Sequence, residues 1–309
     1  MKRVAGIDGG QTSTVAAIVD ERGVVLGRGS AGPSDHVGQA ADSSRAARAC
    51  TQALAQACAA AGLAADAPFE AVAIGLSGYE GAWHGREPVF AARTVRYVHD
   101  ATAALAGAIA DRPAGVVIAG TGSAAYAEGA KGESARAGGY GYLFGDGGGA
   151  FSIARTALAE AMEAADRGVR TDLGDAALPY FDVPDLRALA RAVSLDQIAR
   201  PQIAGFSRVV LDAARFGDPA AAAIVEDAAA SIARLARAVA ERLATAGQPM
   251  PVAFVGGIAE HPLVATAVRA GLARAARIAI VSPAHDAAVG AAFLAFDAAG
   301  LPRPAIVPA

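Results

Sequence analysis

A pattern of strand, glycine-containing turn and strand occurs twice in this chain of 309 residues, with the two copies about 110 residues apart. The first copy spans residues 3–19 and the second spans residues 116–127. In both copies the turn combines glycines with hydroxyl side chains, and further strands and then helices follow it. A repeat of this kind predicts two similar α/β domains that face one cleft.

Both turns have the composition of phosphate-binding turns. Glycine lets a ligand approach the main chain, and neighbouring N–H and hydroxyl groups donate hydrogen bonds to phosphate oxygens. In the first turn we expect Gly9, Gly10 and Thr12 to contact phosphate, while Asp8 at the strand end holds a metal-bound water. An Asp-Gly-Gly sequence alone is more typical of a plain hairpin turn. Neither turn matches the P-loop or the dinucleotide-binding pattern.

Residues 138–149 also constrain the fold, because more than half of them are glycine and the others include two tyrosines and one carboxylate. This composition predicts a bent backbone around a ligand, with Asp146 as the strong hydrogen-bond acceptor. A flexible linker is the alternative interpretation, although linkers favour serine and proline over large apolar residues.

Asp100 lies between the predicted strand 95–98 and a helix predicted over 101–110. Aspartate at this position commonly caps the helix by accepting N–H groups of its first turn. Ligands of open α/β sheets bind at the carboxyl ends of the strands, so the same carboxylate can take a proton from a bound hydroxyl. The two roles are compatible, and we expect both.

Two further glycine-containing turns follow apolar segments. Ser77 and Gly78 come after the predicted buried strand 72–76, and Gly256 and Gly257 come after the predicted strand 252–255. The second pair removes side chains where a nucleobase and ribose could lie against the backbone. Hydrophobic spacing and end signals also predict helices over 39–61, 87–92, 150–165, 262–275 and 285–299, and a helical insertion over 185–246.

Composition excludes several classes of function. The chain has 27 basic and 30 acidic residues, so its net charge of -3 gives no electrostatic footprint for nucleic acid. No apolar run is long enough to span a bilayer, and no signal-like segment develops near the start, so we expect a cytoplasmic protein without membrane contact. Cys50 and Cys58 lie in alanine-rich helical sequence and are too far apart for a disulfide, which indicates buried thiols.

Six motifs occur together in one order: Asp8-Gly9-Gly10-x-Thr12, Gly75-Leu76-Ser77-Gly78, Asp100-Ala101, Gly120-Thr121-Gly122-Ser123, Gly139-x-Gly141-x-x-x-Gly145-Asp146 and Val255-Gly256-Gly257. In order and spacing they resemble the BadF/BadG/BcrA/BcrD ATPase family, and within it the N-acetylglucosamine and glucosamine kinase branch. The resemblance covers nearly the whole chain.

This resemblance implies an α/β fold of the actin, sugar kinase and Hsp70 type, in which two ribonuclease H-like domains close over ATP and Mg²⁺. The domains expected are 1–113 and 114–285, the latter with the helical insertion. The C-terminal helix, 286–309, is expected to pack back on the first domain. The sequence leaves the oligomeric state open between a monomer and a homodimer.

The resemblance also assigns roles. Asp8 and Thr12 match the first phosphate motif and Asp100 matches the catalytic aspartate. The other matches are the second phosphate motif (Gly120, Thr121, Gly122, Ser123), the adenosine motif (Gly256, Gly257) and the sugar-binding residues (Asp35, Ser77, Gly78, Gly139, Tyr140, Asp146). The function implied is ATP-dependent phosphorylation of a hydroxyl of N-acetylglucosamine or glucosamine.

The chain departs from the family pattern in three places. Tyr140 stands where tryptophan is usual, and Gly147-Gly148-Gly149 replaces an acidic-Gly-Ser continuation. Ser34-Asp35 stands where the family often has asparagine. These differences concern the identity of the sugar rather than the ATP site.

Two other functions fit parts of the sequence. The family includes ATP-driven electron activators of acyl-CoA dehydratases, which bind an iron–sulfur cluster through cysteines. Such ligation favours cysteines in exposed glycine-bearing loops, whereas Cys50 and Cys58 are predicted in a helix. The glycines after Asp146 also suggest a nucleotide-binding regulator without turnover.

Overall fold

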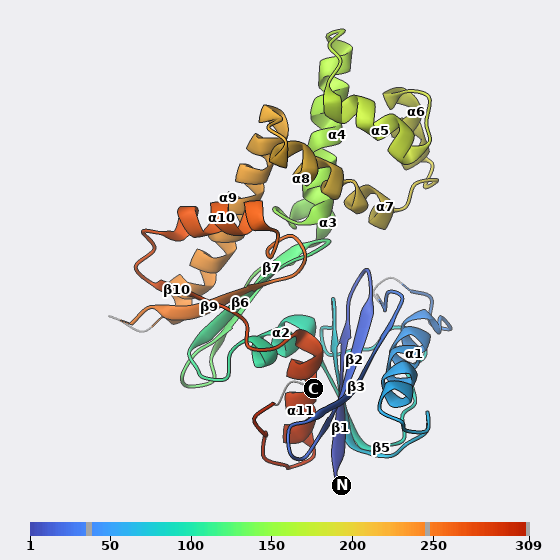
Figure 1. Cartoon of the computed structure of the whole chain (residues 1–309), viewed down its shortest axis with the longest axis vertical. Helices are drawn as coiled ribbons and strands as arrows, with labels where there is room; N and C mark the ends of the chain where they lie inside the picture. Colours follow the sequence, from blue (N-terminus) through green and yellow to red (C-terminus); the bar gives the residue numbers. More distant parts are fainter. Residues whose placement is uncertain (35–38, 245–247, 307–309) are drawn as a thin grey trace. The chain divides into compact units, whose positions relative to one another are not determined.

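The computed structural model describes residues 1–34, 39–244 and 248–306. The chain divides into two compact units: unit 1 is Met1–Val116 with Ser282–Ala309, and unit 2 is Val117–Val281. Unit 1 contains both the first strand and the last helix of the chain (Figure 1). Among the described residues, no helix has the length and apolar character needed to cross a bilayer.

Unit 1 is built on a five-stranded sheet with the strand order β3-β2-β1-β4-β5. The strands are β1 (Arg3–Gly9), β2 (Thr14–Asp20), β3 (Val25–Ala31), β4 (Phe69–Leu76) and β5 (Ala92–His99). β1 pairs antiparallel with β2 and parallel with β4, which in turn pairs parallel with β5. The opening meander predicted from sequence is present, and its first strand extends through Asp8 and Gly9.

Helices cover both faces of this sheet (Figure 1). One face packs against α1 (Arg45–Ala60), and the other packs against α2 (Asp100–Ala108) and α11 (Ala287–Ala298). Alternation along β1 explains the division, because Ala5 and Ile7 face α1 whereas Val4 faces α11. Asp8 therefore projects on the side of α2 and α11.

Unit 2 contains the second sheet, with the strand order β10-β9-β6-β7-β8. Its strands are β6 (Ala114–Ala119), β7 (Ser123–Glu128), β8 (Ser134–Gly138), β9 (Met250–Val255) and β10 (Ile278–Val281). In both sheets three strands consecutive in sequence stand side by side, and the next two are added beside the first of them. The repeat seen in the sequence is thus a repeat of sheet topology.

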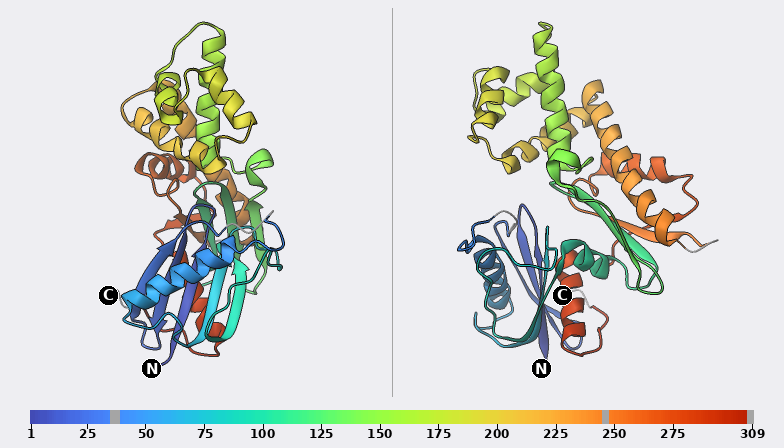
Figure 2. Two further views of the ribbon diagram at one scale, coloured as in Figure 1. Left: turned by 90° about the vertical axis from the view of Figure 1, so that its right-hand side faces the viewer. Right: turned by 180° about the vertical axis from the view of Figure 1, so that it is seen from behind.

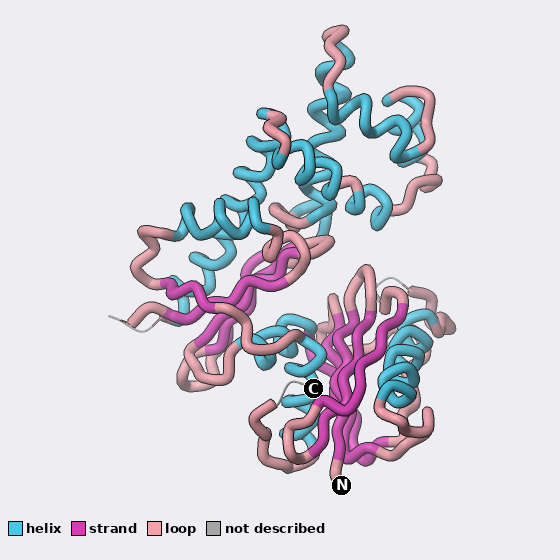
Figure 3. The backbone as a smooth tube through the Cα atoms, in the orientation of Figure 1, coloured by secondary structure: helices cyan, strands magenta, loops and turns pink. Residues whose placement is uncertain are grey.

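In the sequence, most helices of unit 2 come between β8 and β9, and one comes between β9 and β10. Some of these helices lie beside the sheet (Figures 2 and 3). The helices of unit 2 are α3 (Gly141–Phe144), α4 (Ala150–Asp166), α5 (Asp172–Phe181), α6 (Leu186–Ser194), α7 (Arg200–Gly205), α8 (Ser207–Arg215), α9 (Pro219–Leu243) and α10 (Pro262–Leu272). As predicted, Asp218 caps α9 by accepting a hydrogen bond from the Ala221 N–H, 2.9 Å. Ile224 and Ile232 of its apolar stripe are buried.

Three sequence predictions about helices were wrong. The helix predicted from residue 39 begins at Arg45, and residues 87–91 form no helix. Pro88 is buried there and Phe90 packs against the core under α1, so tertiary contacts of an extended segment override the helical pattern. At α2 the N-cap is His99 rather than Asp100, which is the first helical residue.

Glycines set the distance between α11 and its neighbours. A Cβ on Gly6 of β1 would lie 2.1 Å from the Ala288 carbonyl oxygen, and a Cβ on Gly290 of α11 would lie 2.0 Å from that of Ala103 in α2. Both contacts are with backbone atoms, which cannot turn away as a flexible side chain can. The N-terminal ends of α2 and α11 are therefore held close to β1.

We predict that Gly290→Ala destabilises the protein although alanine favours helix. Overpacking a tight contact typically costs about 1–3 kcal/mol, which exceeds the helix-propensity gain of about 1 kcal/mol. Gly271→Ala in α10 is the control, because its Cβ would meet nothing nearer than the Ala233 Cβ at 3.9 Å. Urea unfolding should show the first variant less stable than the parent protein and the second slightly more stable. Equal stability of the two variants would contradict the packing argument.

Candidate active-site residues

In unit 1, strand register brings the predicted residues Asp8 and Asp100 to one region. Asp8 pairs with Gly75 of β4, and a Cβ on Gly75 would lie 3.4 Å from the Asp100 Cα and 2.7 Å from the Ala103 Cβ. Glycine at position 75 therefore lets the start of α2 approach the strand beside Asp8. This packing requires glycine at the first position of the sequence motif Gly75-Leu76-Ser77-Gly78.

Asp286 is a third carboxylate in this region, and sequence reasoning missed it. It caps α11 by accepting the Val289 N–H, 2.9 Å, and pairs with Arg28 of β3, 2.5 Å. The pKa of Asp8 is raised from 3.8 to about 7, first because the carboxyl is buried and then because Asp100 and Asp286 are negatively charged. Three carboxylates thus interact on the face of the sheet that carries α2 and α11.

The first turn is fixed by its own hydrogen bonds. The Gly10 N–H donates to the Ser13 carbonyl, 3.0 Å, and the Thr14 hydroxyl donates to the Gly32 carbonyl, 2.8 Å. Thr12 is exposed on this turn. A Cβ on Gly9 would lie 2.4 Å from the fully buried Ser34 Oγ, so Gly9 is a packing glycine.

The loop of Ser77 joins this turn, because the Ser77 N–H donates to the Gly9 carbonyl, 2.9 Å. Gly78 follows with a positive φ of 75° and is exposed. The structure thus places the predicted residues of β1 and β4 side by side at one sheet edge. Asp35, the remaining predicted residue of unit 1, lies outside the described residues.

In unit 2, three predicted segments meet at the end of β6. The Ala119 carbonyl accepts the N–H groups of Ile258, 3.0 Å, and Ala259, 3.2 Å, which joins the Gly256-Gly257 turn to the second phosphate turn. Gly256 has a φ of 100°, and a Cβ there would lie 2.6 Å from the same carbonyl oxygen. Its N–H donates to the Glu260 carboxylate, 3.1 Å.

The glycine-rich segment contacts the other side of this turn. The Ser123 N–H donates to Asp146 Oδ1, 3.2 Å, and the Ser123 hydroxyl donates to the Gly147 carbonyl, 2.8 Å. The Asp146 carboxylate lies against Gly122, where a Cβ would come within 2.6 Å of its Oδ2. Asp146 itself has a left-handed φ of 59°.

The N-terminus of α4 points at the second turn. The N–H groups of Ala150 and Phe151 donate to the carbonyls of Gly120, 2.8 Å, and Thr121, 3.1 Å. Gly148, with a φ of 88°, has no room for a Cβ because it would lie 2.6 Å from the Ala228 carbonyl oxygen. Packing therefore requires glycine at position 148, which is one of the positions where the chain departs from the family pattern.

The geometry suits a nucleotide. A Cβ on Gly120 or on Gly257 would enter open space, so ligand atoms can approach the main chain at these two positions. A helix N-terminus beside a glycine turn favours the negative charge of phosphate. The residues of unit 2 thus fit ATP.

The segment that the sequence predicts to bind sugar begins with Gly139, whose N–H donates to the Ser123 carbonyl, 3.0 Å. Tyr140 follows with an exposed side chain and precedes the short helix α3, which the sequence did not predict. The Tyr142 ring makes an edge contact with Phe151, and the Arg200 guanidinium lies 5.0 Å from its centre. Asp146 closes the segment after Gly145.

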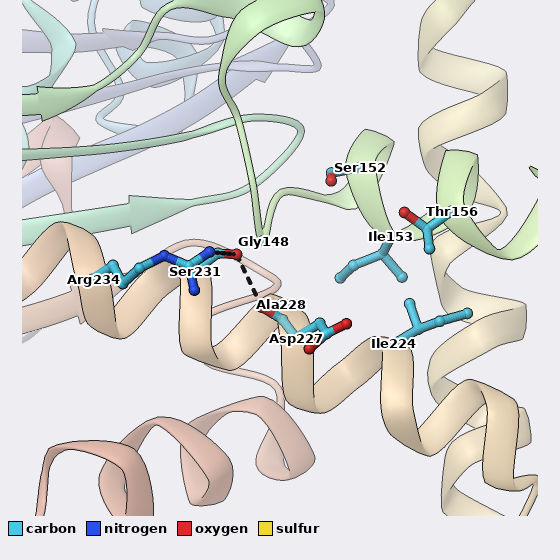
Figure 4. Close-up of a pocket in the computed structure, with 9 residues that line it drawn as sticks. All are labelled: Gly148, Ser152, Ile153, Thr156, Ile224, Asp227, Ala228, Ser231 and Arg234. Carbon is cyan, nitrogen blue, oxygen red and sulfur yellow. Dashed lines mark hydrogen bonds between the residues drawn. The ribbon is translucent and has the colours of Figure 1, made fainter.

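A groove of about 360 Å³ lies between α4 and α9, beside Gly148. Its polar wall is a hydrogen-bonded chain in which Arg234 donates to the Ser231 hydroxyl, 2.8 Å, which donates to the Asp227 carbonyl, 2.9 Å (Figure 4). Ser152 and Thr156 add hydroxyls from α4. Gly148 belongs to the glycine-rich segment, but none of the individual site residues predicted from sequence lines this groove.

The chain thus combines a duplicated α/β architecture with a glycine-rich turn in each unit. It also has an aspartate at the start of a helix that follows a strand. The sequence profile of the BadF/BadG/BcrA/BcrD ATPase family matches residues 5–295, and the chain belongs to this family. The family and the fold predicted from sequence are confirmed.

One curated relative is a sugar kinase. The N-acetylmuramic acid/N-acetylglucosamine kinase of Clostridium acetobutylicum is 33% identical over 162 residues, 52% of this chain and 53% of the relative. The chain therefore spans about half the length of that curated relative.

Solved structures agree with this fold. A proposed N-acetylglucosamine kinase from Chromobacterium violaceum matches 95% of this chain and 99% of its own, with a TM-score of 0.76 and 28% identity. The ROK family glucokinase of Streptomyces griseus, solved with glucose and AMPPNP, matches 96% of this chain and 99% of its own, with a TM-score of 0.59. At 19% identity the second likeness concerns the fold alone.

We predict that Asp8→Asn stabilises the protein more at pH 8 than at pH 5. The folded protein binds a proton on Asp8 more tightly than the unfolded chain does, because the pKa is higher in the folded state. The stability that this proton contributes is therefore complete below about pH 4 and is lost as the pH rises through about 7. One pKa unit corresponds to about 1.4 kcal/mol, so the difference should reach a few kcal/mol.

Urea unfolding of both proteins at the two pH values measures this effect. The exposed Asp212 of α8 provides a control, Asp212→Asn, for changes unrelated to Asp8. The same stability difference at pH 5 and pH 8 would show that burial and the neighbouring carboxylates do not hold the proton on Asp8.

Proposed function

We propose that this protein is an ATP-dependent kinase that phosphorylates a hydroxyl of an amino sugar, N-acetylglucosamine or glucosamine. The observation that carries the proposal is Asp100, a carboxylate fixed at the start of α2 in a chain of an ATPase family. The named functions of the similar proteins support the same chemistry.

The residues around the end of β6 would bind ATP. The turns Gly120–Ser123 and 256–257 would contact the phosphates and the adenosine, because both expose main chain beside a helix or strand end. In unit 1, Gly9, Gly10 and Thr12 would contribute to phosphate binding. We propose that the two units are the two ribonuclease H-like domains expected from sequence, 1–113 and 114–285.

Asp8 would orient the water shell of Mg²⁺ bound to ATP. No group of three or more carboxylate, histidine or cysteine side chains among the described residues is arranged to hold a metal ion directly. Mg²⁺ commonly keeps several waters and uses one or two carboxylates plus phosphates. A cation also favours the ionised form of Asp8, whose pKa is raised by burial and by two neighbouring carboxylates.

Asp100 would act as the base. It accepts the proton of the sugar hydroxyl as the oxygen forms its bond to the γ-phosphorus, and the bond from that phosphorus to the oxygen of ADP breaks. Little other covalent work falls to the protein, so positioning and charge stabilisation account for most of the catalysis.

The sugar would be held by Asp146, Tyr140 and Gly139 of unit 2 and by Ser77 and Gly78 of unit 1. Asp146 can accept sugar hydroxyls because its carboxylate has two oxygens, of which Oδ1 already accepts the Ser123 N–H. Asp35 stays a predicted sugar contact. A carboxylate there would pair with a sugar ammonium and favour glucosamine over its acetylated form.

Two properties expected from the sequence stay proposals. We expect the kinase to act in the cytoplasm, where ATP is available, and its oligomeric state is open between monomer and homodimer. Sedimentation analysis would decide the oligomeric state directly.

The electron-activator interpretation is not retained. Cys50 and Cys58 are both fully buried in α1, and burial raises the pKa of the Cys50 thiol to about 12. Neither lies in an exposed loop from which it could ligate a cluster. A nucleotide-binding regulator remains the alternative, and a coupled ADP-release assay over N-acetylglucosamine, glucosamine, N-acetylmuramic acid and glucose tests it. ATP binding without turnover of any sugar would favour the regulator.

We predict that Asp100→Asn lowers kcat by at least about two orders of magnitude, because base catalysis typically contributes about 10²–10⁴-fold. The amide keeps an oxygen that can accept the Ala101 N–H, now 2.7 Å from Asp100 Oδ1, so thermal stability and ATP affinity should change little. Asp172→Asn is a matched control, since Asp172 is the exposed first residue of α5. Turnover near that of the parent protein in a folded Asp100→Asn variant would show that another group is the base.

We predict that Asp146→Asn raises the KM for the sugar about ten- to a hundredfold and leaves the KM for ATP nearly unchanged. A hydrogen bond to a charged group contributes about 1.5–3 kcal/mol, and asparagine tolerates the left-handed backbone of this position. Asp182→Asn is the control, because Asp182 also has a positive φ, 52°, but caps α5. An unchanged sugar KM would remove Asp146 from the site.

A further inference from the structure

His99 and Asp100 contact each other at the junction of β5 and α2. His99 Nδ1 lies 2.7 Å from Asp100 Oδ1, and their side chains are 17% and 21% exposed. His99 has an extended backbone, with φ -64° and ψ 141°, and pairs with Leu76 of β4. His99 and Asp100 are thus both held by regular secondary structure.

The Ala101 N–H decides which atom of His99 carries a proton. The Ala101 N–H donates to Asp100 Oδ1, with an N–O distance of 2.7 Å, and to His99 Nδ1, with an N–N distance of 3.2 Å. A backbone N–H has one proton, and the shorter bond to a carboxylate is the stronger one. With the Ala101 proton on Oδ1, His99 Nδ1 cannot face Oδ1 at 2.7 Å as a lone pair, because two acceptors would repel each other. A proton on Nδ1 removes this repulsion, because an Nδ1–H group can donate to Oδ1.

We propose that His99 is a positioning residue for the catalytic base: its Nδ1–H and the Ala101 N–H both donate to Asp100 Oδ1, which leaves Oδ2 to accept the proton of the sugar hydroxyl. This inference rests on the proposed function. In the transfer step the hydroxyl O–H bond breaks and its proton moves to Oδ2. His99 keeps its proton throughout and holds the plane of the carboxylate.

The charges around this junction agree with a donor at Nδ1. Asp100 lies within the electrostatic reach of Asp8, and Asp8 also interacts with Asp286. Arg28 pairs with Asp286. A hydrogen-bond donor on Asp100 offsets part of the repulsion among the three carboxylates, whereas an acceptor would add to it.

A double-mutant cycle tests the proposal. His99→Ala should lower kcat about ten- to a hundredfold, as misplacement of a reacting group does, while the KM for ATP stays within about twofold. In the Asp100→Asn background the same change should have little further effect, because the base that His99 positions is gone. His84→Ala, at an exposed histidine of the same unit, is the control and should leave kcat unchanged.

A second measurement separates positioning from helix capping. If His99 only caps α2, His99→Ala lowers the midpoint of thermal unfolding and reduces kcat equally in both backgrounds, which would overturn the proposal. Nitrogen-15 NMR of labelled histidine should show a proton on His99 Nδ1 at pH 8, and a proton on Nε2 alone would also overturn it.

Different results would contradict the proposed function and the proposed role of His99. A parent protein that phosphorylates no sugar contradicts the proposed function and the role of His99 with it. An active parent protein in which His99→Ala retains full kcat contradicts the role of His99 alone.

Discussion

The absence of a side chain at Gly6, Gly75 and Gly290 is the constraint on which the arrangement in unit 1 depends. Each of these glycines removes the atom that would separate a strand or helix from the element beside it. Because β1, α2 and α11 then lie in close contact, three carboxylates at their ends interact, and one of them has its pKa raised to about 7. Close packing of small residues thus produces an unusual electrostatic environment.

In unit 2, glycines also allow chain segments to approach closely, but with a different result. The Ala119 carbonyl binds two N–H groups of the turn after β9, and Gly122, Gly149 and Gly256 allow three loops to converge beside it. Here convergence leaves main chain open at Gly120 and Gly257, with one carboxylate, Asp146, beside the turn. The two units therefore share a strand order but differ in what their sheet edges offer to a ligand.

Much of this could be predicted from sequence, because strands, glycine turns and the caps of long helices are local features. The strands of the first meander, the cap of α9 and the family motifs all follow from neighbouring residues. Residues 87–91 were misjudged because Phe90 packs against core residues distant in sequence and Pro88 is buried. The C-terminal helix was expected to pack on the first domain, but Asp286 was missed because its approach to Asp8 depends on how closely α11 packs on β1, which no local pattern shows. His99 was overlooked because an imidazole before a helix has no local pattern that distinguishes a cap from a hydrogen-bond donor.

The left-handed backbone of Asp146 limits which residues can replace it, and so limits changes at this proposed sugar contact. At a φ of 59° most side chains are strained, so only glycine, asparagine and aspartate fit without cost. Tyr140 lies in the same segment with an exposed side chain and negative φ, so it accepts many residues. Substitutions at position 140 therefore probe the proposed sugar contact with less backbone strain than substitutions at position 146.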